Sequence, residues 1–205
     1  VAMVIATSTA AAQDAAELID IDYDDLPVVI GFDKALAPDT PPIHKNIPGN
    51  VCFDIEYGDQ AKADAAFARA AKIVRATIES PRIAPTPMEP RAVLAWYDAA
   101  RQTYEIRCGN QGGLAMRDAL AAMLGVKPAE MRVHMVDVGG AFGSRTQPFP
   151  ENALLLHAAK KIGKPIKWTS TRSEDFVTDF HGRAIRVAGE RCARAPGPRR
   201  SSACR

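Results

Sequence analysis

The sequence predicts a mixed fold of the α+β class, in which helices and strands alternate irregularly along the chain. Short apolar runs rich in β-branched residues alternate with alanine-rich segments of helical periodicity. Proline clusters separate these segments, and 47% of the 205 residues are hydrophobic. A chain of this length and composition can bury a core in one domain or in two smaller ones.

The N-terminal segment predicts a strand, a helix and a second strand in close succession. The apolar run of residues 1–7 favours a strand, the alanine-rich residues 9–19 favour a helix, and residues 20–29 alternate as a strand does. Four prolines follow between residues 31 and 59. Because proline opposes helix formation, we expect this stretch to be an extended, proline-rich linker.

A second block begins near Gln60. Alanines and apolar spacing predict a helix over residues 62–74, which passes into a strand that ends at Ser80. Four prolines between residues 81 and 90 exclude a regular helix. Two short strands then follow, over residues 92–98 and 103–109, joined by a polar turn.

The remainder of this block predicts two helices and two strands. A loop leads into a helix that Gly125 can end, and residues 131–138 form the next strand. Pro150 suits the first turn of a second helix, which Gly163 ends. This helix is apolar nearly all round, so we expect it to be buried. Residues 164–172 predict a final strand.

Residues 189–205 differ in composition from the rest of the chain. They contain five arginines, two prolines, two serines and two cysteines, and no apolar side chain larger than alanine apart from the cysteines. Such a segment has little to bury, so we expect a disordered basic tail that contributes neither strand nor helix. The abrupt change suggests the hypothesis that its reading frame is shifted.

Charge and cysteine usage exclude several functional classes. The net charge of +2 argues against a nucleic-acid partner, and no apolar run reaches the roughly 18 residues of a membrane span. The four cysteines lack a CxxC pair or a nearby histidine at ligand spacing, so they predict free thiols, with no metal site. Together with the absence of a recognisable signal segment, these features predict a cytoplasmic protein.

The sequence DVGGAFGSRTQPFPEN, residues 137–152, carries the clearest functional signal. A glycine-rich junction before a helix can direct backbone N–H groups at an anionic or electron-rich ligand. Its spacing matches neither a P-loop nor a dinucleotide fingerprint, which argues against ATP and NAD. On the residues alone, a plain glycine turn and a ligand cradle remain equally good alternatives.

Three motifs in order connect this loop to a known family: PMEPR at residues 87–91, GNQGG at residues 109–113 and GGAFG at residues 139–143. This arrangement resembles the large subunit of the molybdenum hydroxylases, the family of xanthine dehydrogenase, aldehyde oxidase and aerobic carbon monoxide dehydrogenase. The resemblance implies an N-terminal-half fragment. Residues 1–30 would be the C-terminal half of an α/β hammerhead domain, and residues 60–188 part of the molybdopterin-binding domain.

The resemblance also implies which residues contact the cofactor. The glutamine of the middle motif would donate its side-chain amide to a metal oxo group, and the glycine loop would lie against the pterin, with its aromatic side chain excluding water. We expect Glu89 and Arg91 to form a local solvated pair. Arg145 either offers charge to the cofactor or reaches solvent. The cofactor-binding residues implied are Gln111, Gly112, Gly139, Gly140, Ala141, Phe142, Gly143 and Arg145.

The activity implied by the resemblance is hydroxylation of an aldehyde-type carbon, or oxidation of carbon monoxide, with water as the oxygen source. Thr146 stands where purine-oxidising members have a glutamate, which makes xanthine a poorer candidate. The implied cofactor is molybdopterin with molybdenum, including the cytosine dinucleotide form. FAD and 2Fe-2S clusters are expected on a medium and a small partner subunit, in a dimer of heterotrimers.

No catalytic or metal-ligating residue is assigned within this chain, because the general base of the family lies further toward the C-terminus. We therefore expect the isolated chain to be inactive. The alternative is a non-enzymatic folded remnant, or a binding module that keeps the scaffold without the cofactor.

Overall fold

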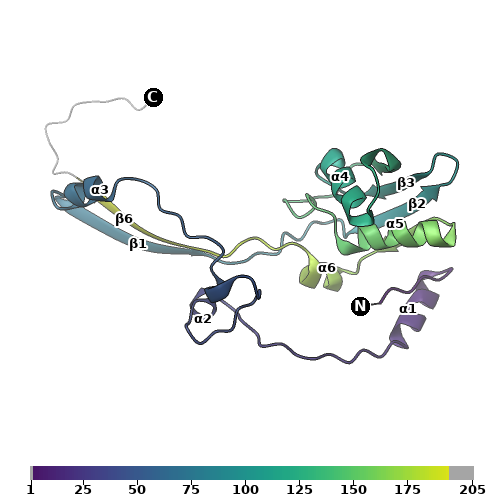
Figure 1. The fold of residues 1–205 in the computed structure, drawn as a ribbon, viewed down its shortest axis with the longest axis horizontal. Helices are drawn as coiled ribbons and strands as arrows, with labels where there is room; N and C mark the ends of the chain where they lie inside the picture. Colours follow the sequence, from purple (N-terminus) through teal and green to yellow (C-terminus); the bar gives the residue numbers. More distant parts are fainter. Residues whose placement is uncertain (1, 194–205) are drawn as a thin grey trace. The chain divides into compact units, whose positions relative to one another are not determined.

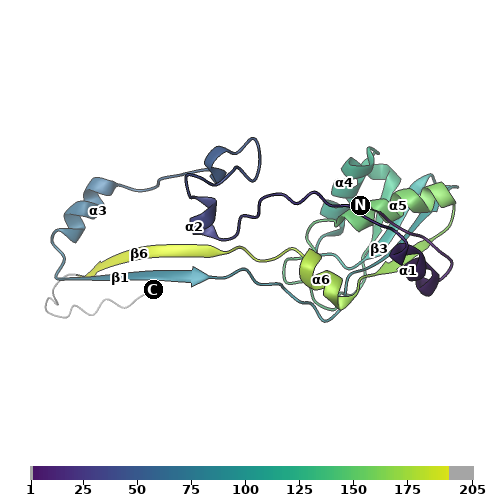
Figure 2. The same cartoon turned by 90° about the horizontal axis from the view of Figure 1, so that it is seen from below.

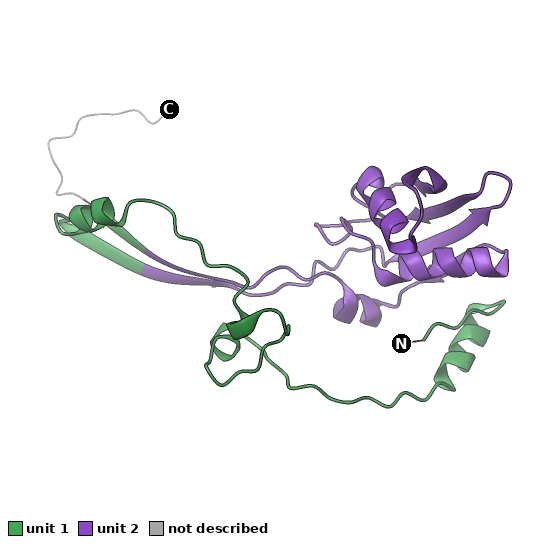
Figure 3. Ribbon diagram, viewed as in Figure 1, with its two compact units in different colours: residues 1–75, 190–205 green, residues 76–189 purple. Residues whose placement is uncertain are grey.

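The computed structural model describes residues 2–193 and divides the chain into two compact units (Figure 3). One unit comprises residues 76–189, and the other comprises residues 1–75 with 190–205. Helices and strands are mixed in the described part of the chain, as the α+β prediction requires.

The centre of unit 76–189 is a four-stranded mixed sheet in the order β4-β3-β2-β5. Its two middle strands, β2 and β3, are labelled in Figure 1. β2 pairs antiparallel with both β3 and β5, whereas β3 and β4 are parallel. The strands are β2 (Ala92–Asp98), β3 (Thr103–Cys108), β4 (Met131–His134) and β5 (Ile166–Thr169).

Two helices pack on one face of this sheet and form the core with it. Alternate residues of β2 and β3 are buried against them, as expected for a sheet covered on that face. Leu120 of α4 and Leu156 of α5 are fully buried in the same cluster. The helices of the unit are α4 (Gly113–Leu124), the 3-10 turn η2 (Pro128–Glu130), α5 (Pro150–Ile162) and α6 (Arg172–Thr178).

Both predicted helix ends at glycine are confirmed. Gly125 and Gly163 adopt left-handed backbone angles immediately after α4 and α5, with φ of 66° and 71°. An L side chain is strained in this region, whereas glycine enters it freely. α5 is buried on one face only, in contrast to the prediction: five of its 13 residues lie in the interior, whereas Leu154 and Ile162 are exposed.

The two later strands are shorter than predicted. β4 stops at His134 instead of residue 138, because its partner β3 ends one residue beyond the pairing of Arg107 with His134. β5 stops at Thr169, because the next residues are engaged elsewhere. Ser170 donates its backbone N–H to the carbonyl of Arg91, and Thr171 caps α6.

The unit formed by residues 1–75 and 190–205 has little buried surface in its described part. Its helix α1 (Thr9–Glu17) is capped by Ser8 and confirms the predicted helix. The predicted strands over 1–7 and 20–29 are wrong for the described residues, which have no regular structure there. A strand requires a hydrogen-bonding neighbour, and the described chain offers these segments none.

The proline-rich segment 31–59 is not uniformly extended. It contains α2 (Phe32–Ala35) and a 3-10 turn, η1 (Pro48–Asn50). Asn50 holds the two together, because its amide donates to the carbonyls of Ala35 and Pro41 and its oxygen accepts from the N–H of Ile43 at 2.7 Å. The side chain thus supplies hydrogen bonds that the prolines cannot.

α3 (Gln60–Phe67) is shorter than the predicted helix because β1 (Lys72–Ser80) begins within the expected helical range. β1 pairs with β6 (Ile185–Ala193) in a separate two-stranded sheet, which is labelled in Figure 1 and in Figure 2. Arg75 pairs with Glu190, and Arg186 with Glu79.

The prediction that residues 189–205 contribute no strand is therefore wrong for residues 189–193. These residues enter β6 through backbone pairing, which needs no large apolar side chain. The rest of the predicted tail, residues 194–205, lies outside the described residues, and so does the frame-shift hypothesis. No described helix is both long enough and apolar enough to cross a membrane.

Candidate cofactor site

The glycine loop, residues 139–143, joins β4 to the segment before α5. Gly140 and Gly143 have φ of 106° and 87°, and Phe142 itself lies in the left-handed region at 51°. A Cβ atom on Gly139 would lie 2.6 Å from the Cβ of Glu89, and one on Gly140 would lie 3.3 Å from the Cβ of Pro87. The first two glycines therefore permit close packing as well as an unusual backbone.

The carbonyl of Ala141 closes the loop as a turn. It accepts hydrogen bonds from the backbone N–H of Ser144 at 2.9 Å and from the Ser144 hydroxyl at 2.8 Å. Within residues 2–193, the backbone N–H groups of residues 140–143 donate to no protein group. Four consecutive donors are thus free for solvent or a ligand. The Phe142 side chain is 76% exposed beside them.

Gln111 is joined to the end of the glycine loop by paired hydrogen bonds. Its backbone N–H donates to the carbonyl of Arg145 at 3.1 Å, and its Oε1 accepts from the Arg145 backbone N–H at 3.2 Å. Thr146 Oγ1 lies 3.5 Å from the same oxygen. Because the oxygen is engaged, the exposed amide nitrogen of Gln111 is the group left available as a donor.

Gln111 does not cap the helix that follows it. The N-cap of α4 is Gly112, which makes no side-chain capping bond, and its backbone N–H donates to Asn110 Oδ1 at 3.2 Å. The buried Asn110 thereby fixes the loop in which Gln111 lies. Gln111 therefore belongs to the loop before α4 and is not its capping residue.

The expectation of a local Glu89–Arg91 pair is wrong, because each side chain has a different partner. Glu89 Oε2 accepts from Arg145 Nη1 at 2.6 Å and from the backbone N–H of Gly139 at 2.7 Å. The Glu89 backbone carbonyl accepts from Arg145 Nη2. The Arg145 side chain is only 4% exposed, so the alternative in which it reaches solvent is also wrong.

Arg91 instead lies in a buried cluster of acidic groups. Its Nε lies 2.8 Å from Glu151 Oε1 and its Nη1 2.5 Å from Asp179 Oδ1, while Thr178 Oγ1 accepts from Nη2 at 2.7 Å. Burial alone would lower the pKa of Arg91, but the hydrogen bonds to Asp179 and Glu151 outweigh it and raise that pKa. The ring of Phe149 stacks under the guanidinium.

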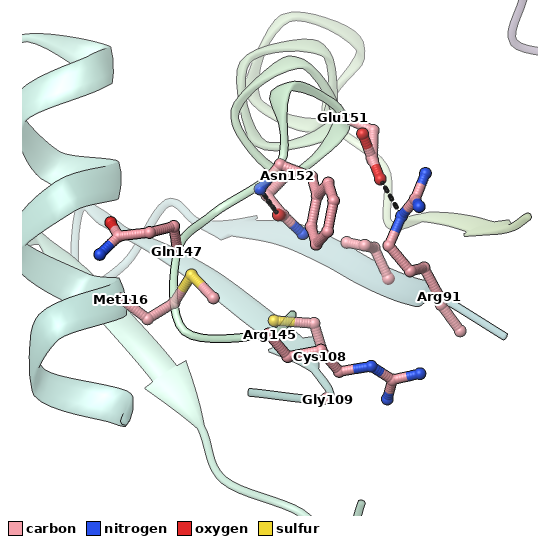
Figure 4. Close-up of a pocket in the computed structure, with 11 residues that line it drawn as sticks. Arg91, Cys108, Gly109, Met116, Arg145, Gln147, Glu151 and Asn152 are labelled. Carbon is pink, nitrogen blue, oxygen red and sulfur yellow. Dashed lines mark hydrogen bonds and ion pairs between the residues drawn. The ribbon is translucent and has the colours of Figure 1, made fainter. Parts of the chain in front are cut away.

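A small cavity lies between this cluster and residues Cys108, Met116 and Arg145 (Figure 4). Its volume of about 20 Å³ holds about one water molecule and excludes a pterin. Cys108 lies in its wall, and burial raises the pKa of this thiol to about 11 despite the nearby Arg145. Outside this cavity, the glycine loop and Gln111 present free hydrogen-bond donors.

The three sequence motifs meet through these contacts. Gln111, Gly139 and Arg145 are joined directly or through Glu89, and Gly140, Ala141, Phe142 and Gly143 lie between them in the loop. Sequence reasoning missed Arg172, which donates to the carbonyls of Pro87 and Met88, both at 2.8 Å. The signal for its helix was the capping box formed by Thr171 and Glu174.

Residues 43–197 match the family model of the molybdopterin cofactor-binding domain. The chain is 30% identical to the carbon monoxide dehydrogenase large chain of Hydrogenophaga pseudoflava over 96% of its length, and covers 26% of that protein. It is 36% identical to the gamma subunit of the 6-hydroxypseudooxynicotine dehydrogenase complex of Paenarthrobacter nicotinovorans, over 90% of this chain and 23% of that subunit.

Solved structures show the same likeness. Quinoline 2-oxidoreductase from Pseudomonas putida 86 superposes with a TM-score of 0.82 at 28% identity, over 92% of this chain and 24% of that one. Reconstituted carbon monoxide dehydrogenase from Oligotropha carboxidovorans also has a TM-score of 0.82, at 26% identity, over 91% and 25%. The chain spans about a quarter of the length of these relatives. With the family model matching most of its residues, the chain belongs to the molybdopterin cofactor-binding domain family of molybdenum hydroxylase large subunits.

Proposed function

We propose that this chain forms one wall of the molybdopterin site of a molybdenum hydroxylase, and that Gln111 and residues 139–143 contact the cofactor. The observation that carries the proposal is the hydrogen-bonded joining of three motifs distant in sequence, PMEPR, GNQGG and GGAFG. The joined surface leaves free the donors that a polar cofactor needs.

The residues present fit such a group. The free N–H groups of residues 140–143 and the amide nitrogen of Gln111 are hydrogen-bond donors on one loop cluster, and oxo, phosphate and dithiolene groups are acceptors. Cβ-free positions at Gly139 and Gly140 keep the backbone closely packed on Pro87 and Glu89. Phe142 presents an exposed aromatic face, which suits exclusion of water from a bound pterin.

When bound, the cofactor supplies the redox and oxygen-transfer chemistry, and the protein supplies binding and orientation. Gln111 would donate from its amide nitrogen, while Arg145 keeps its guanidinium in contact with Glu89 and holds the end of the loop. In this arrangement, Arg145 acts on the cofactor through the loop backbone. Gly112 would contribute as the uncapped start of α4.

We propose that the parent enzyme hydroxylates an electrophilic carbon, as in an aldehyde, or oxidises carbon monoxide, with water as the oxygen source. Thr146 supports this choice, because its hydroxyl turns back to the carbonyl of Gly143 at 3.0 Å and offers no carboxylate to a purine. Relatives named for nicotine and quinoline make an N-heterocycle the second candidate substrate class.

We further propose that the parent enzyme works with partner subunits that carry FAD and 2Fe-2S clusters, assembled as a dimer of heterotrimers. The names of the relatives support a multi-subunit enzyme, since they are a large chain, a large subunit and a subunit of a complex. The cytosine dinucleotide form of molybdopterin is the proposed cofactor. The 205-residue chain alone is expected to be catalytically silent.

Pterin binding tests the proposal directly. The chain is purified from a host that makes molybdopterin, then oxidised, and the pterin is measured by fluorescence together with molybdenum content. We expect pterin in the wild type, less in Gln111→Leu, and unchanged pterin in Gln13→Leu, an exposed glutamine on α1. A wild type without pterin contradicts the proposed function and supports a binding module without the cofactor. Aldehyde turnover by the chain alone contradicts its expected silence.

A further inference from the structure

We propose that Glu89 is the positioning residue of the glycine loop, and that its carboxylate holds the loop in the conformation that receives the cofactor. The inference rests on the proposed function and extends it to a residue outside the loop. Its basis is the convergence of two hydrogen bonds on one carboxylate oxygen, fifty residues before the loop.

The first step is the geometry of the carboxylate. A single oxygen, Oε2, accepts from Gly139 N–H at 2.7 Å and from Arg145 Nη1 at 2.6 Å, so it ties the first residue of the loop to Arg145, two residues beyond its end. The Glu89 backbone adds a bond at each end of this bridge, from its N–H to the Gly139 carbonyl at 3.1 Å and from Arg145 Nη2 to its own carbonyl.

The second step is the tight packing around these hydrogen bonds. A Cβ on Gly139 would lie 2.6 Å from the Glu89 Cβ, and one on Gly109 would overlap Arg145 Nη1. The Arg145 side chain is almost fully buried, whereas Glu89 is about one-third exposed. Loss of the carboxylate would therefore leave a buried cation without its counter-ion, and the loop would have to move to solvate it.

The third step connects Glu89 to the glutamine that faces the cofactor. The Arg145 backbone N–H donates to Gln111 Oε1 at 3.2 Å, and this bond sets which way the glutamine amide points. Movement of Arg145 would therefore misdirect the Gln111 amide nitrogen as well as the free N–H groups of residues 140–143. One carboxylate thus controls both sets of donors.

The test compares Glu89→Ala and Glu89→Gln in the full chain. The first readout is amide hydrogen exchange without cofactor at Ser144 and Arg145, whose N–H groups are hydrogen-bonded at the end of the loop, and the second is retained pterin, measured by fluorescence after oxidation. In Glu89→Ala we expect loop exchange to rise and pterin to fall, each by about tenfold, the size of one lost hydrogen bond to a charged group. Glu89→Gln keeps an oxygen for the Gly139 amide, so it should recover part of both.

Two control variants separate positioning from general stability. Glu151→Gln weakens the buried Arg91 cluster, and Glu79→Gln removes the charge of an exposed Arg186 pair. Neither carboxylate contacts the loop, so neither variant should raise loop exchange selectively. If Glu89→Ala does not fold, the comparison of Glu89→Gln with Glu151→Gln at matched stability gives the same test.

The outcomes are distinguishable. Unchanged loop exchange in the Glu89 variants overturns the positioning role, and so does pterin retention equal to the wild type. A wild type that binds no pterin overturns the proposed function. It then also overturns the proposal that Glu89 positions the loop for a cofactor. In that case the exchange data alone still show whether Glu89 holds the loop.

Discussion

Replacement of Arg91 by methionine should destabilise unit 76–189 more than any exposed charge deletion. Three carboxylates lie around the guanidinium, those of Glu151, Asp179 and Asp175, and the last two are buried. Methionine keeps much of the volume but leaves Glu151 and Asp179 without the cation they pair with, whereas Asp175 keeps Arg172 at 3.6 Å. Removing one partner from a buried ion pair costs about 3–5 kcal/mol, a large part of the 5–15 kcal/mol typical of a domain.

The assay is urea unfolding followed by tryptophan fluorescence. Both tryptophans of the chain lie in the four-stranded sheet, Trp96 in β2 and Trp168 in β5, so they report on this unit. The free energy of unfolding of Arg91→Lys should lie between those of Arg91→Met and the wild type. The lysine ammonium keeps the charge but loses the planar set of N–H donors of the guanidinium.

Arg101→Met is the matched control, because Arg101 pairs with Asp98 at an exposed site within the same unit and such pairs contribute at most about 1 kcal/mol. A loss for Arg91→Met no larger than for this control would refute the reasoning.

Three further predictions follow from local structure. At pH 8.5, iodoacetamide should alkylate the buried Cys108 at least about tenfold more slowly than the exposed Cys52, because burial raises the Cys108 pKa to about 11 and leaves little thiolate. Equal rates by peptide mass spectrometry would contradict this. Gly163→Ala should lower the free energy of unfolding by about 1 kcal/mol, because alanine is strained in the left-handed backbone conformation at this position. Gly189→Ala should lower it by little, because Gly189 has no positive φ. Similar losses for both variants in urea titrations would disprove the strain argument. Gly140→Val should reduce retained pterin, measured by fluorescence, because the φ of Gly140 is 106° and Pro87 and Phe142 fill the space that the new side chain needs. Pterin retention equal to the wild type would argue against a contact between this loop and the cofactor.

Local signals predicted the elements of the sheet unit well, where hydrophobic pattern and tertiary burial agree. The β2 and β3 strands and the glycine ends of α4 and α5 follow from alternation and from backbone angles that favour glycine. The strands expected over 1–7 and 20–29 failed for the opposite reason. Their apolar residues carry strand propensity, but propensity without a pairing neighbour does not form a strand.

The sequence predicted which residues belong to the candidate site, but it did not predict which of them pair with one another. The motifs around Gln111 and Gly139 were evident from residue types and order, because they resemble a family pattern. The pairing of Glu89 was misjudged, since proximity in sequence suggested Arg91 as its partner. The actual partner, Arg145, is 56 residues away, and the parallel crossover between β3 and β4 with its following loop brings it there.

Residue order alone was enough to establish the mixed fold, the glycine-ended helices and membership of a molybdopterin-binding family, because each depends on local backbone preferences or on motifs read in a line. Tertiary structure alone decided which charges are paired, which strands have partners and which donors of the glycine loop are free. The reason is physical: ion pairs and strand ladders depend on distances between segments far apart in sequence, and burial sets their strength.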